Sequence, residues 1–533
     1  MQRPRVFTIP PGAPFLATFA QRLLAGDIAP GYSAVLGPLG LSSATIYVPT
    51  RRAARALAQE LTRALGAPAA LLPRILPLGG LEDGETEFLF SEPEAGGDLT
   101  PDVPPAIGAL ERRMLLARLI LAWAGKLRGA IVRVGADGAL ETDADEALVV
   151  GASASNAWVL SRDLAHLIDE MIIEGVAWSR LDDLSLAAFD RYWGVTLDFL
   201  DIAIRAWPNI LAERGLIDAA ERQKLLIDAQ ATRLAAGASG PVIAIGSTGT
   251  NAATARLLAA IARAPQGAVV LPGLDQTLDA ASFALVAGET PEEARAGHPQ
   301  AALARLLPIL GLRREEAISL GAPDAALAAR ARFVSEALRP AETSERWRDF
   351  DARDIAAALD SVTLIEAEDE REEALALAMV LREALEEPET TTALVTPDRD
   401  LARRVQSQLL RWGVEIDDSG GAPLSKSPFG ALATLAAGAG AELTAAGAVA
   451  LLASPMTRLG FARGDILRLR PLVEIGGLRG VAPPEALADP SALVDAAKAA
   501  AQEKHAPPAK AAIPDSAWTE TAAVLARLDG ALA

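Results

Sequence analysis

Cysteine is absent from this chain of 533 residues, and histidine occurs only three times. Without cysteine the chain forms no disulfide and supplies no thiolate to a zinc ion or an iron–sulfur cluster. The histidines, His166, His298 and His505, are widely separated in the sequence. Any metal bound by this chain would therefore need carboxylate ligands.

Familiar catalytic motifs are also missing. The sequence contains no GxSxG turn, no HExxH helix, no EF-hand loop and no GxGxxG after a strand. The acidic run at residues 366–374 would bind a metal only if its carboxylates converged. A helix N-terminus stabilised by its macrodipole explains that run more simply. The sequence therefore predicts no catalytic constellation.

Long apolar runs are scarce. The best candidate for a membrane span, residues 431–453, is mostly Ala and Gly and is interrupted by Glu442. The N-terminus reaches Pro10 and Pro11 before an apolar segment forms, so a secretory signal is not expected. We therefore expect a cytoplasmic protein with no membrane partner. The formal net charge of −19 argues against a generally basic surface but permits a local basic groove.

The residues that are present describe a globular α/β chain. Hydrophobic residues make up 51% and aromatics 4% of a chain long enough for two large domains. Most of its strand-type runs are followed by a helical pattern, which predicts parallel sheets covered by helices. These runs lie at residues 6–9, 45–48, 242–245, 268–271, 362–365 and 392–395.

The order of patterns predicts two domains, residues 1–340 and 341–533. The boundary is a charged, irregular stretch at residues 341–354. The first domain is predicted to contain an all-helical insertion at about residues 105–235, where apolar residues recur at helical spacing. The second is predicted to repeat the strand–helix order at about residues 355–430, and then to continue into an Ala-rich helical insertion that looks truncated.

The N-terminal stretch has the order of a nucleotide-binding entrance. A short strand, the turn PPGAP and a helical pattern follow one another, as in a phosphate-binding loop. The turn contains Gly12 but no Gly-Lys-Ser/Thr, and no lysine precedes Lys126. We therefore predict a strand–turn–helix without a ligand, and a magnesium-independent anion site is the alternative.

A second junction, at residues 246–251, places small polar side chains between a strand and a helix. They are Ser247, Thr248, Thr250 and Asn251. Such groups at a helix N-terminus suit an anion, and nucleic-acid phosphate is the commonest partner. A turn capped by its own side chains explains the pattern equally well. No acidic pair follows the strand, so the magnesium carboxylate of a Walker B motif is missing.

Arginines begin two further helices, one in each predicted α/β unit. The first helix begins at Thr50, Arg51, Arg52 and Arg55, and the second bears Arg399 and Arg403. Thr50 is a plausible N-cap, and the second pair shares a helix face at i, i+4. Two such helix starts favour a shared nucleic-acid groove. The alternative for the second helix is a solvated face that pairs with Asp398 and Asp400.

Several long segments together resemble one family. They are VFTIPPGAPFLATFAQRLL (6–24), ATIYVPTRRAARAL (44–57), VIAIGSTGTNAATARLLAAIARAPQGAVVLPGLD (242–275) and SPMTRLGF (454–461). From its first residue to about Leu469, the sequence is similar to the AddB family of the alphaproteobacterial double-strand break repair helicase–nuclease.

The resemblance implies two RecA-like domains of the UvrD/Rep, superfamily 1 helicase kind, each with a helical insertion and decayed motor motifs. It implies a non-catalytic DNA-binding and scaffolding subunit that helps to process double-strand breaks for recombinational repair and to recognise a Chi-type sequence. The implied partners are the AddA subunit, which supplies ATP binding and translocation, DNA ends and single-stranded DNA, at the nucleoid of the cytoplasm. No cofactor is expected in this chain. An iron–sulfur cluster and magnesium are expected only in a nuclease domain beyond residue 533.

The residues expected near DNA or at the decayed nucleotide cleft are Gly12, Thr50, Arg51, Arg52, Arg55, Ser247, Thr248, Thr250, Asn251, Arg399 and Arg403. Two other functions stay open on the sequence. One is a divergent ATP-dependent DNA helicase with an unorthodox phosphate loop, and the other is a purely structural partner-binding module.

Overall fold

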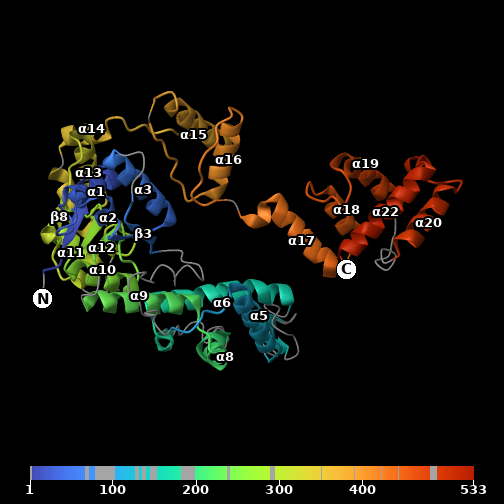
Figure 1. Ribbon diagram of the computed structural model, residues 1–533, viewed down its shortest axis with the longest axis horizontal. Helices are drawn as coiled ribbons and strands as arrows, with labels where there is room; N and C mark the ends of the chain where they lie inside the picture. The colour runs from blue at the N-terminus through green and yellow to red at the C-terminus, as the bar shows by residue number, and fades with distance from the viewer. Residues whose placement is uncertain are drawn as a thin grey trace. The chain divides into compact units, whose positions relative to one another are not determined.

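The structure is a computed structural model that describes most of the chain. The described residues are 3–66, 71–78, 103–126, 131–134, 140–143, 153–181, 199–236, 240–288, 295–349, 351–388, 390–421, 423–441, 443–479 and 489–532. The chain divides into two compact units, Met1–Thr363 and Leu364–Ala533. They are called unit 1 and unit 2, and each is described by itself (Figure 1).

A six-stranded parallel sheet forms the centre of unit 1, in the order β3-β2-β6-β7-β1-β8. The strands are β1 (Val6–Ile9), β2 (Thr45–Val48), β3 (Arg74–Pro77), β6 (Val242–Ile245), β7 (Gly267–Pro272) and β8 (Ile318–Ser319). The predicted α/β class is confirmed, and so are the predicted strands at residues 6–9, 45–48, 242–245 and 268–271. Every residue of β1 and β6 is buried, as in parallel strands covered on both faces.

Helices cover the two faces of this sheet. One face packs against α1 (Phe15–Ala25), α2 (Gly37–Leu41) and α3 (Arg51–Leu65). The other packs against α9 (Ala219–Ala235), α10 (Ala252–Arg263) and α12 (Ala301–Leu310). Successive residues of a strand point to opposite faces, so Val269 belongs to one core and Val270 to the other.

Within its described residues, the inserted region of unit 1 is mainly helical and contains one antiparallel strand pair. Its helical elements are α5 (Ala109–Lys126), α6 (Ala154–Glu174), η2 (Trp178–Leu181), the π-helix η3 (Ile202–Ala206) and α8 (Trp207–Arg214). Strands β4 (Ile131–Val134) and β5 (Leu140–Asp143) pair antiparallel within it. The expectation of an all-helical insertion is therefore wrong here, because the β-branched run of β4 favours a strand.

Buried polar contacts join the helices of the insertion. The Arg112 guanidinium on α5 lies 2.8 Å from the carboxylate of Asp218 and 2.8 Å from that of Asp169 on α6. The Trp207 Nε1–H donates to Asp218 Oδ2 at 3.0 Å. Burial raises the pKa of Asp218, although Arg112 opposes the shift. A buried carboxylate must be paired to be tolerated, so these contacts hold α5, α6 and α8 in one arrangement.

Unit 1 continues through the charged stretch at residues 341–354, where the sequence predicted a boundary. The remaining elements of unit 1 are η1 (Ala34–Leu36), α11 (Ala280–Ala287), η4 (Arg314–Glu316), α13 (Ala325–Ala337), η5 (Ala341–Asp349) and α14 (Ala352–Leu359). Helix α13 packs against α14. The stretch is therefore built into the unit as η5 and α14.

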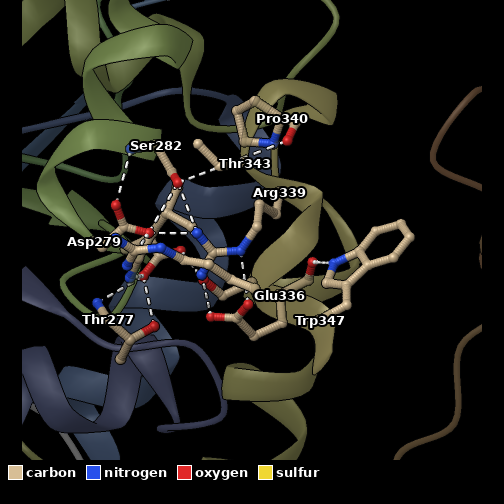
Figure 2. A network of polar contacts seen from close by, with 12 residues as sticks. Thr277, Asp279, Ser282, Glu336, Arg339, Pro340, Thr343 and Trp347 are labelled. Carbon is tan, nitrogen blue, oxygen red and sulfur yellow. Dashed lines mark hydrogen bonds and ion pairs between the residues drawn. The ribbon is translucent and has the colours of Figure 1, made fainter. Parts of the chain in front are cut away.

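A polar network fastens η5 to α11 and α13, and Arg339 is at its centre (Figure 2). The Arg339 side chain is 3% exposed and forms ion pairs with Asp279 and Glu336. It also donates to Ser282 Oγ at 2.6 Å, and the Ser282 and Thr343 hydroxyls lie 2.8 Å apart. Burial alone would raise the pKa of Asp279, but hydrogen bonds from Arg339 and Ser282 hold it well below its usual range.

The described residues of unit 2 form helices joined by loops and contain no strand. Its elements are α15 (Glu370–Ala384), α16 (Arg399–Leu410), η6 (Leu424–Lys426), α17 (Pro428–Ala441), α18 (Ala445–Ala453), α19 (Arg463–Val473), the π-helix η7 (Glu474–Leu478), α20 (Pro490–Ala501), α21 (Pro508–Ala511) and α22 (Asp515–Leu532). The predicted strands at residues 362–365 and 392–395 are therefore wrong. A strand requires a paired neighbour, and residues 361–370 are exposed without one.

No helix within the described ranges is long and apolar enough to cross a membrane.

Candidate functional site

The candidate functional site lies where the carboxyl ends of β2 and β6 meet, and it is called the β2–β6 crevice because the connections of these two strands diverge there. These strands are neighbours in the sheet. The chain leaves β2 for α3 on one face and leaves β6 for α10 on the other. In open α/β sheets, ligands bind where adjacent connections diverge in this way, beyond the carboxyl ends of the strands.

One wall of the crevice is the first turn of α3. Thr50 is its N-cap, and the Thr50 Oγ1 accepts a hydrogen bond from the Ala53 N–H at 3.1 Å. Arg51, Arg52 and Arg55 follow, and all three side chains are exposed. Arg51 and Arg52 also take part in interactions with the rest of the chain. The predicted N-cap is confirmed, and three guanidinium groups lie at the positive end of the helix dipole.

The opposite wall is the loop at residues 246–251. Gly246 has φ +70°, and a Cβ at this position would lie 3.5 Å from Pro49 and 3.6 Å from the ring of Phe15. This close approach brings the loop after β6 against the loop after β2. The structure thus brings together two of the predicted sites, residues 50–55 and residues 246–251, which are about 200 positions apart in the sequence.

Two side chains of this loop hold the loop itself. Asn251 caps α10, since its Oδ1 accepts from the Thr254 N–H at 2.8 Å, and Ser247 Oγ accepts from the Gly249 N–H at 3.3 Å. The capped turn considered from the sequence is therefore present. These contacts use acceptor atoms only, so the Asn251 amide N–H groups and the Ser247 hydroxyl hydrogen stay available as donors. Thr248 is partly buried and Thr250 is exposed.

Arg305 of α12 also belongs to this site, and sequence reasoning missed it. Residues Gly249, Thr250 and Asn251 line a cavity of about 430 Å³ together with Arg305 and Glu174, on the side of the loop away from α3, none of whose residues line it. The Arg305 side chain is exposed and makes no ion pair with a described residue. A single cation in the otherwise apolar run AALARLLPIL was the available signal.

The structure places Gly12 in a packed turn two strands away from this crevice. Gly12 has φ +84°, and a Cβ there would lie 2.9 Å from Leu327 Cβ. Three of the five residues in PPGAP are prolines without an N–H, and the Ala13 N–H already donates to the Pro10 carbonyl at 3.2 Å. The turn therefore lacks the row of free amides that cradles a phosphate.

A second cavity, of about 590 Å³, adjoins the Gly12 turn at the ends of β1 and β7. Its polar groups are held by the chain. Asp275 Oδ1 accepts from the Thr277 N–H at 2.7 Å, and Asp275 Oδ2 accepts from the Ser335 hydroxyl at 2.5 Å. Burial would raise the pKa of Asp275, but these hydrogen bonds outweigh it and lower the pKa. The cavity is also lined by His298, Arg330 and Arg332, and each of these side chains already has a partner in the chain.

The structure places Arg399 and Arg403 in unit 2, each beside a carboxylate. The Arg399 guanidinium pairs with Asp418 through two hydrogen bonds, of 2.9 and 2.5 Å, and Arg403 pairs with Asp400. Asp398 caps α16 instead of pairing with an arginine, since its Oδ1 accepts from the Asp400 and Leu401 N–H groups. Both cations are thus engaged by the chain's own carboxylates, as in the solvated-face alternative.

The chemistry available at the β2–β6 crevice is that of anion binding. It offers guanidinium, hydroxyl and amide donors and two helix N-termini. In the described part of the chain, no group of three or more His, Asp or Glu residues could hold a metal ion. The arrangement is suited to hold a phosphate oxygen in place.

No protein-family model matches the chain, and no curated protein matches it.

Proposed function

We propose that this chain is a non-catalytic, DNA-binding and scaffolding subunit of an ATP-dependent helicase–nuclease that processes DNA double-strand breaks. In this proposal it belongs to the AddB family, pairs with AddA in the cytoplasm at the nucleoid, and takes part in recognising a Chi-type sequence. Unit 1, which contains the parallel sheet, then corresponds to a RecA-like domain that has lost its motor residues, whereas the second such domain that the resemblance implies has no sheet among the described residues of unit 2. Any iron–sulfur cluster or magnesium belongs to a nuclease domain elsewhere. The segments that resemble this family support the proposal.

The β2–β6 crevice is the single observation that carries the proposal. The N-terminus of α3 carries three arginines, the loop before α10 meets it at Pro49, and Arg305 lines a cavity beside that loop. The described residues contain no cluster of carboxylates that could hold a metal. Phosphates along a nucleic-acid backbone are bound by this combination of cations, hydroxyls and helix N-termini. Binding without chemistry is what the crevice supports best.

The N-terminal turn supports assigning ATP hydrolysis to the partner. A phosphate loop works through backbone N–H groups, a lysine and a magnesium-binding hydroxyl. Here the prolines remove amide donors and Leu327 packs against Gly12. The turn then maintains the shape of the sheet edge and takes no part in phosphate transfer.

The test is the salt dependence of binding by the full chain to a fluorescent single-stranded oligonucleotide, measured by anisotropy. One variant replaces the three α3 arginines: Arg51→Ala, Arg52→Ala and Arg55→Ala. Each lost phosphate contact should reduce the slope of log K against log salt by about 0.7, so the triple variant should lose roughly 2 units of slope.

The matched control removes three exposed arginines near the amino ends of the strands. They are Arg3→Ala, Arg63→Ala and Arg313→Ala. The control should retain the wild-type slope. Its three side chains lie near the amino ends of the strands, whereas the crevice lies at the carboxyl ends. Equal losses in both variants would show that the whole surface, and not the crevice, attracts DNA.

Two further outcomes would favour the other functions. DNA-stimulated ATP hydrolysis by the purified chain above background would indicate a divergent helicase. Absence of salt-dependent retention of single-stranded DNA, by the chain and by its complex with AddA, would indicate a purely structural module. We expect background hydrolysis and binding that weakens steeply with salt.

A further inference from the structure

The cavity beside the loop at residues 246–251 has a set of polar groups of its own, separate from the arginines of α3. Its volume of about 430 Å³ is in the usual range of small-ligand sites. Glu174, the last residue of α6, and Arg305 of α12 line it together with Thr250 and Asn251. The rest of the described lining is glycine, alanine, leucine, isoleucine and proline. Apolar walls with a few polar groups are typical of a site that recognises a small organic group.

The carboxylate and the guanidinium of this cavity are both available to a ligand. Glu174 and Arg305 are exposed. Neither forms an ion pair with the other or with any other described residue. Two opposite charges that line one cavity without pairing can contact two different edges of the same ligand. Because a carboxylate repels a phosphate, Glu174 also argues against a phosphate inside this cavity.

Asn251 adds donors whose direction is fixed. Its Oδ1 accepts a hydrogen bond from the Thr254 N–H at 2.8 Å, so the side-chain amide is held in one orientation. Its two amide N–H groups are left as donors, and the Thr250 hydroxyl is exposed beside them. The cavity therefore offers several donors and one carboxylate acceptor.

We propose that this cavity binds one unpaired guanine base of a bound DNA strand. Guanine presents two adjacent acceptors, N7 and O6, and two adjacent donors, N1–H and N2–H, on different edges. Arg305 donates two hydrogen bonds to the acceptor pair, as arginine commonly does, and Glu174 accepts two from the donor pair. Adenine, cytosine and thymine each lack at least one of these pairs. The inference rests on the proposed function, because the base reaches the cavity from a bound single strand.

The walls of the cavity suit the flat faces of a base. Leu306, Pro308 and Ile309 of α12 lie on one side of the lining, and Ala252 and Ala255 of α10 contribute to it as well. Apolar side chains are a common packing surface for a base that has left its stack. The arginines of α3, which do not line the cavity, then hold the phosphates of the strand.

Base-substituted oligonucleotides test the proposal. The probes are fluorescent strands of twelve thymidines whose central base is replaced by guanine, adenine, hypoxanthine or 7-deazaguanine. Hypoxanthine lacks the N2 amino group that Glu174 would accept from, and 7-deazaguanine lacks the N7 that Arg305 would donate to. Binding to the full chain is measured by anisotropy at one salt concentration. We expect the guanine strand to bind about tenfold more tightly than the adenine strand.

Two variants assign the contacts. Glu174→Ala should bind the guanine and hypoxanthine strands equally, and Arg305→Ala should bind the guanine and 7-deazaguanine strands equally. Each result is a ratio within one variant, so a general loss of stability cannot imitate it. The matched controls are Glu170→Ala, one turn earlier on α6, and Arg313→Ala, after α12, since neither residue lines the cavity. Both controls should keep the wild-type ratios.

Three results would overturn the proposal. Equal affinity of the unmodified chain for all four strands would show that no base is read, and it would leave the proposed function intact if binding still weakened with salt. Wild-type ratios in Glu174→Ala and Arg305→Ala would show that guanine is read elsewhere. Protection of residues 249–251 and 302–309 from hydrogen exchange by deoxyguanosine monophosphate, without a guanine preference among the strands, would assign the cavity to a free nucleotide. Failure of every strand to bind would instead remove the proposed function, and this inference with it.

Discussion

Unit 1 and the start of unit 2 have the same sequence pattern but different structures. The run VFTI of β1 and the run TTALV at residues 391–395 are both apolar or β-branched, and a helix follows each. In unit 1, β1 pairs with β7, which lies about 260 residues later, and becomes fully buried. In unit 2 no described strand pairs with residues 391–395, and Val395 stays exposed. The difference shows that a strand-type sequence needs a neighbour from elsewhere before it is a strand.

The two units also use ion pairs differently. Arg339 of unit 1 is buried between two carboxylates, while Arg399 of unit 2 is half-exposed and pairs with Asp418 at the surface. Breaking a buried pair leaves an unpaired charge out of water, whereas an exposed pair is screened by solvent. Burial therefore decides how much each arginine contributes.

The largest expected effect is that of Arg339→Ala. Because Asp279 and Glu336 lose their buried partner, we expect the local opening free energy of residues 339–349 to fall by about 3–5 kcal/mol. Hydrogen exchange measured by mass spectrometry resolves this segment from unit 2. The control Arg399→Ala should leave hydrogen exchange at α16 nearly unchanged, because solvent screens this exposed pair. Similar changes in both variants would contradict the conclusion that burial decides how much each arginine contributes.

The sheet itself provides the second comparison. Ile243 is fully buried in β6, so Ile243→Ala should destabilise unit 1 by about 2–5 kcal/mol through lost burial and a cavity. Val395→Ala should change unit 2 by no more than about 0.5 kcal/mol, because its side chain is already in water. Denaturant unfolding followed by hydrogen exchange measures both. A large loss for Val395→Ala in the isolated chain would mean that residues 391–395 are already paired.

Two glycines with a left-handed backbone allow the cost of backbone strain to be measured apart from the cost of steric crowding. Gly12 has φ +84° and lacks room for a Cβ, while Gly413 of unit 2 has φ +69° and open space around it. Gly413→Ala should cost about 1 kcal/mol of backbone strain, and Gly12→Ala about 1–3 kcal/mol more because Leu327 must shift. Thermal unfolding of the two variants gives the difference. Equal destabilisation would indicate that α13 does not close over the turn.

The smallest expected effect is a pH dependence at Asp279. Its pKa is lowered in the folded state, so the stability it contributes is complete above its ordinary value near 3.8 and is lost as the pH falls below that value. One proton changes the unfolding free energy by at most about 1.4 kcal/mol per pH unit. Asp279→Asn should reduce the fall of the unfolding free energy, measured by urea unfolding, between pH 5 and pH 2.5. An unchanged fall would mean that other carboxylates dominate acid unfolding.

Local sequence patterns were sufficient to predict the buried strands of unit 1 and the N-cap Thr50. The predicted strands of unit 1 are compact apolar runs, and Thr50 precedes its helix as N-caps do. Strands β3 and β8 were not predicted, since RILP is only partly apolar and β8 is two residues long. Arg305 was missed because its place in the crevice depends on α12 packing against α10, which no local pattern reports.

By itself, the sequence determined the α/β class, the absence of thiol chemistry, most strands of the first sheet and the missing phosphate-loop lysine. These are properties of residue type and of short-range spacing. Only the tertiary structure decided which junctions meet, because the crevice between β2 and β6 joins residues 50–55 to residues 246–251 through the order of the sheet. It also decided that Gly12 is packed by Leu327 and that residues 391–395 stay unpaired, since both depend on which distant segments become neighbours.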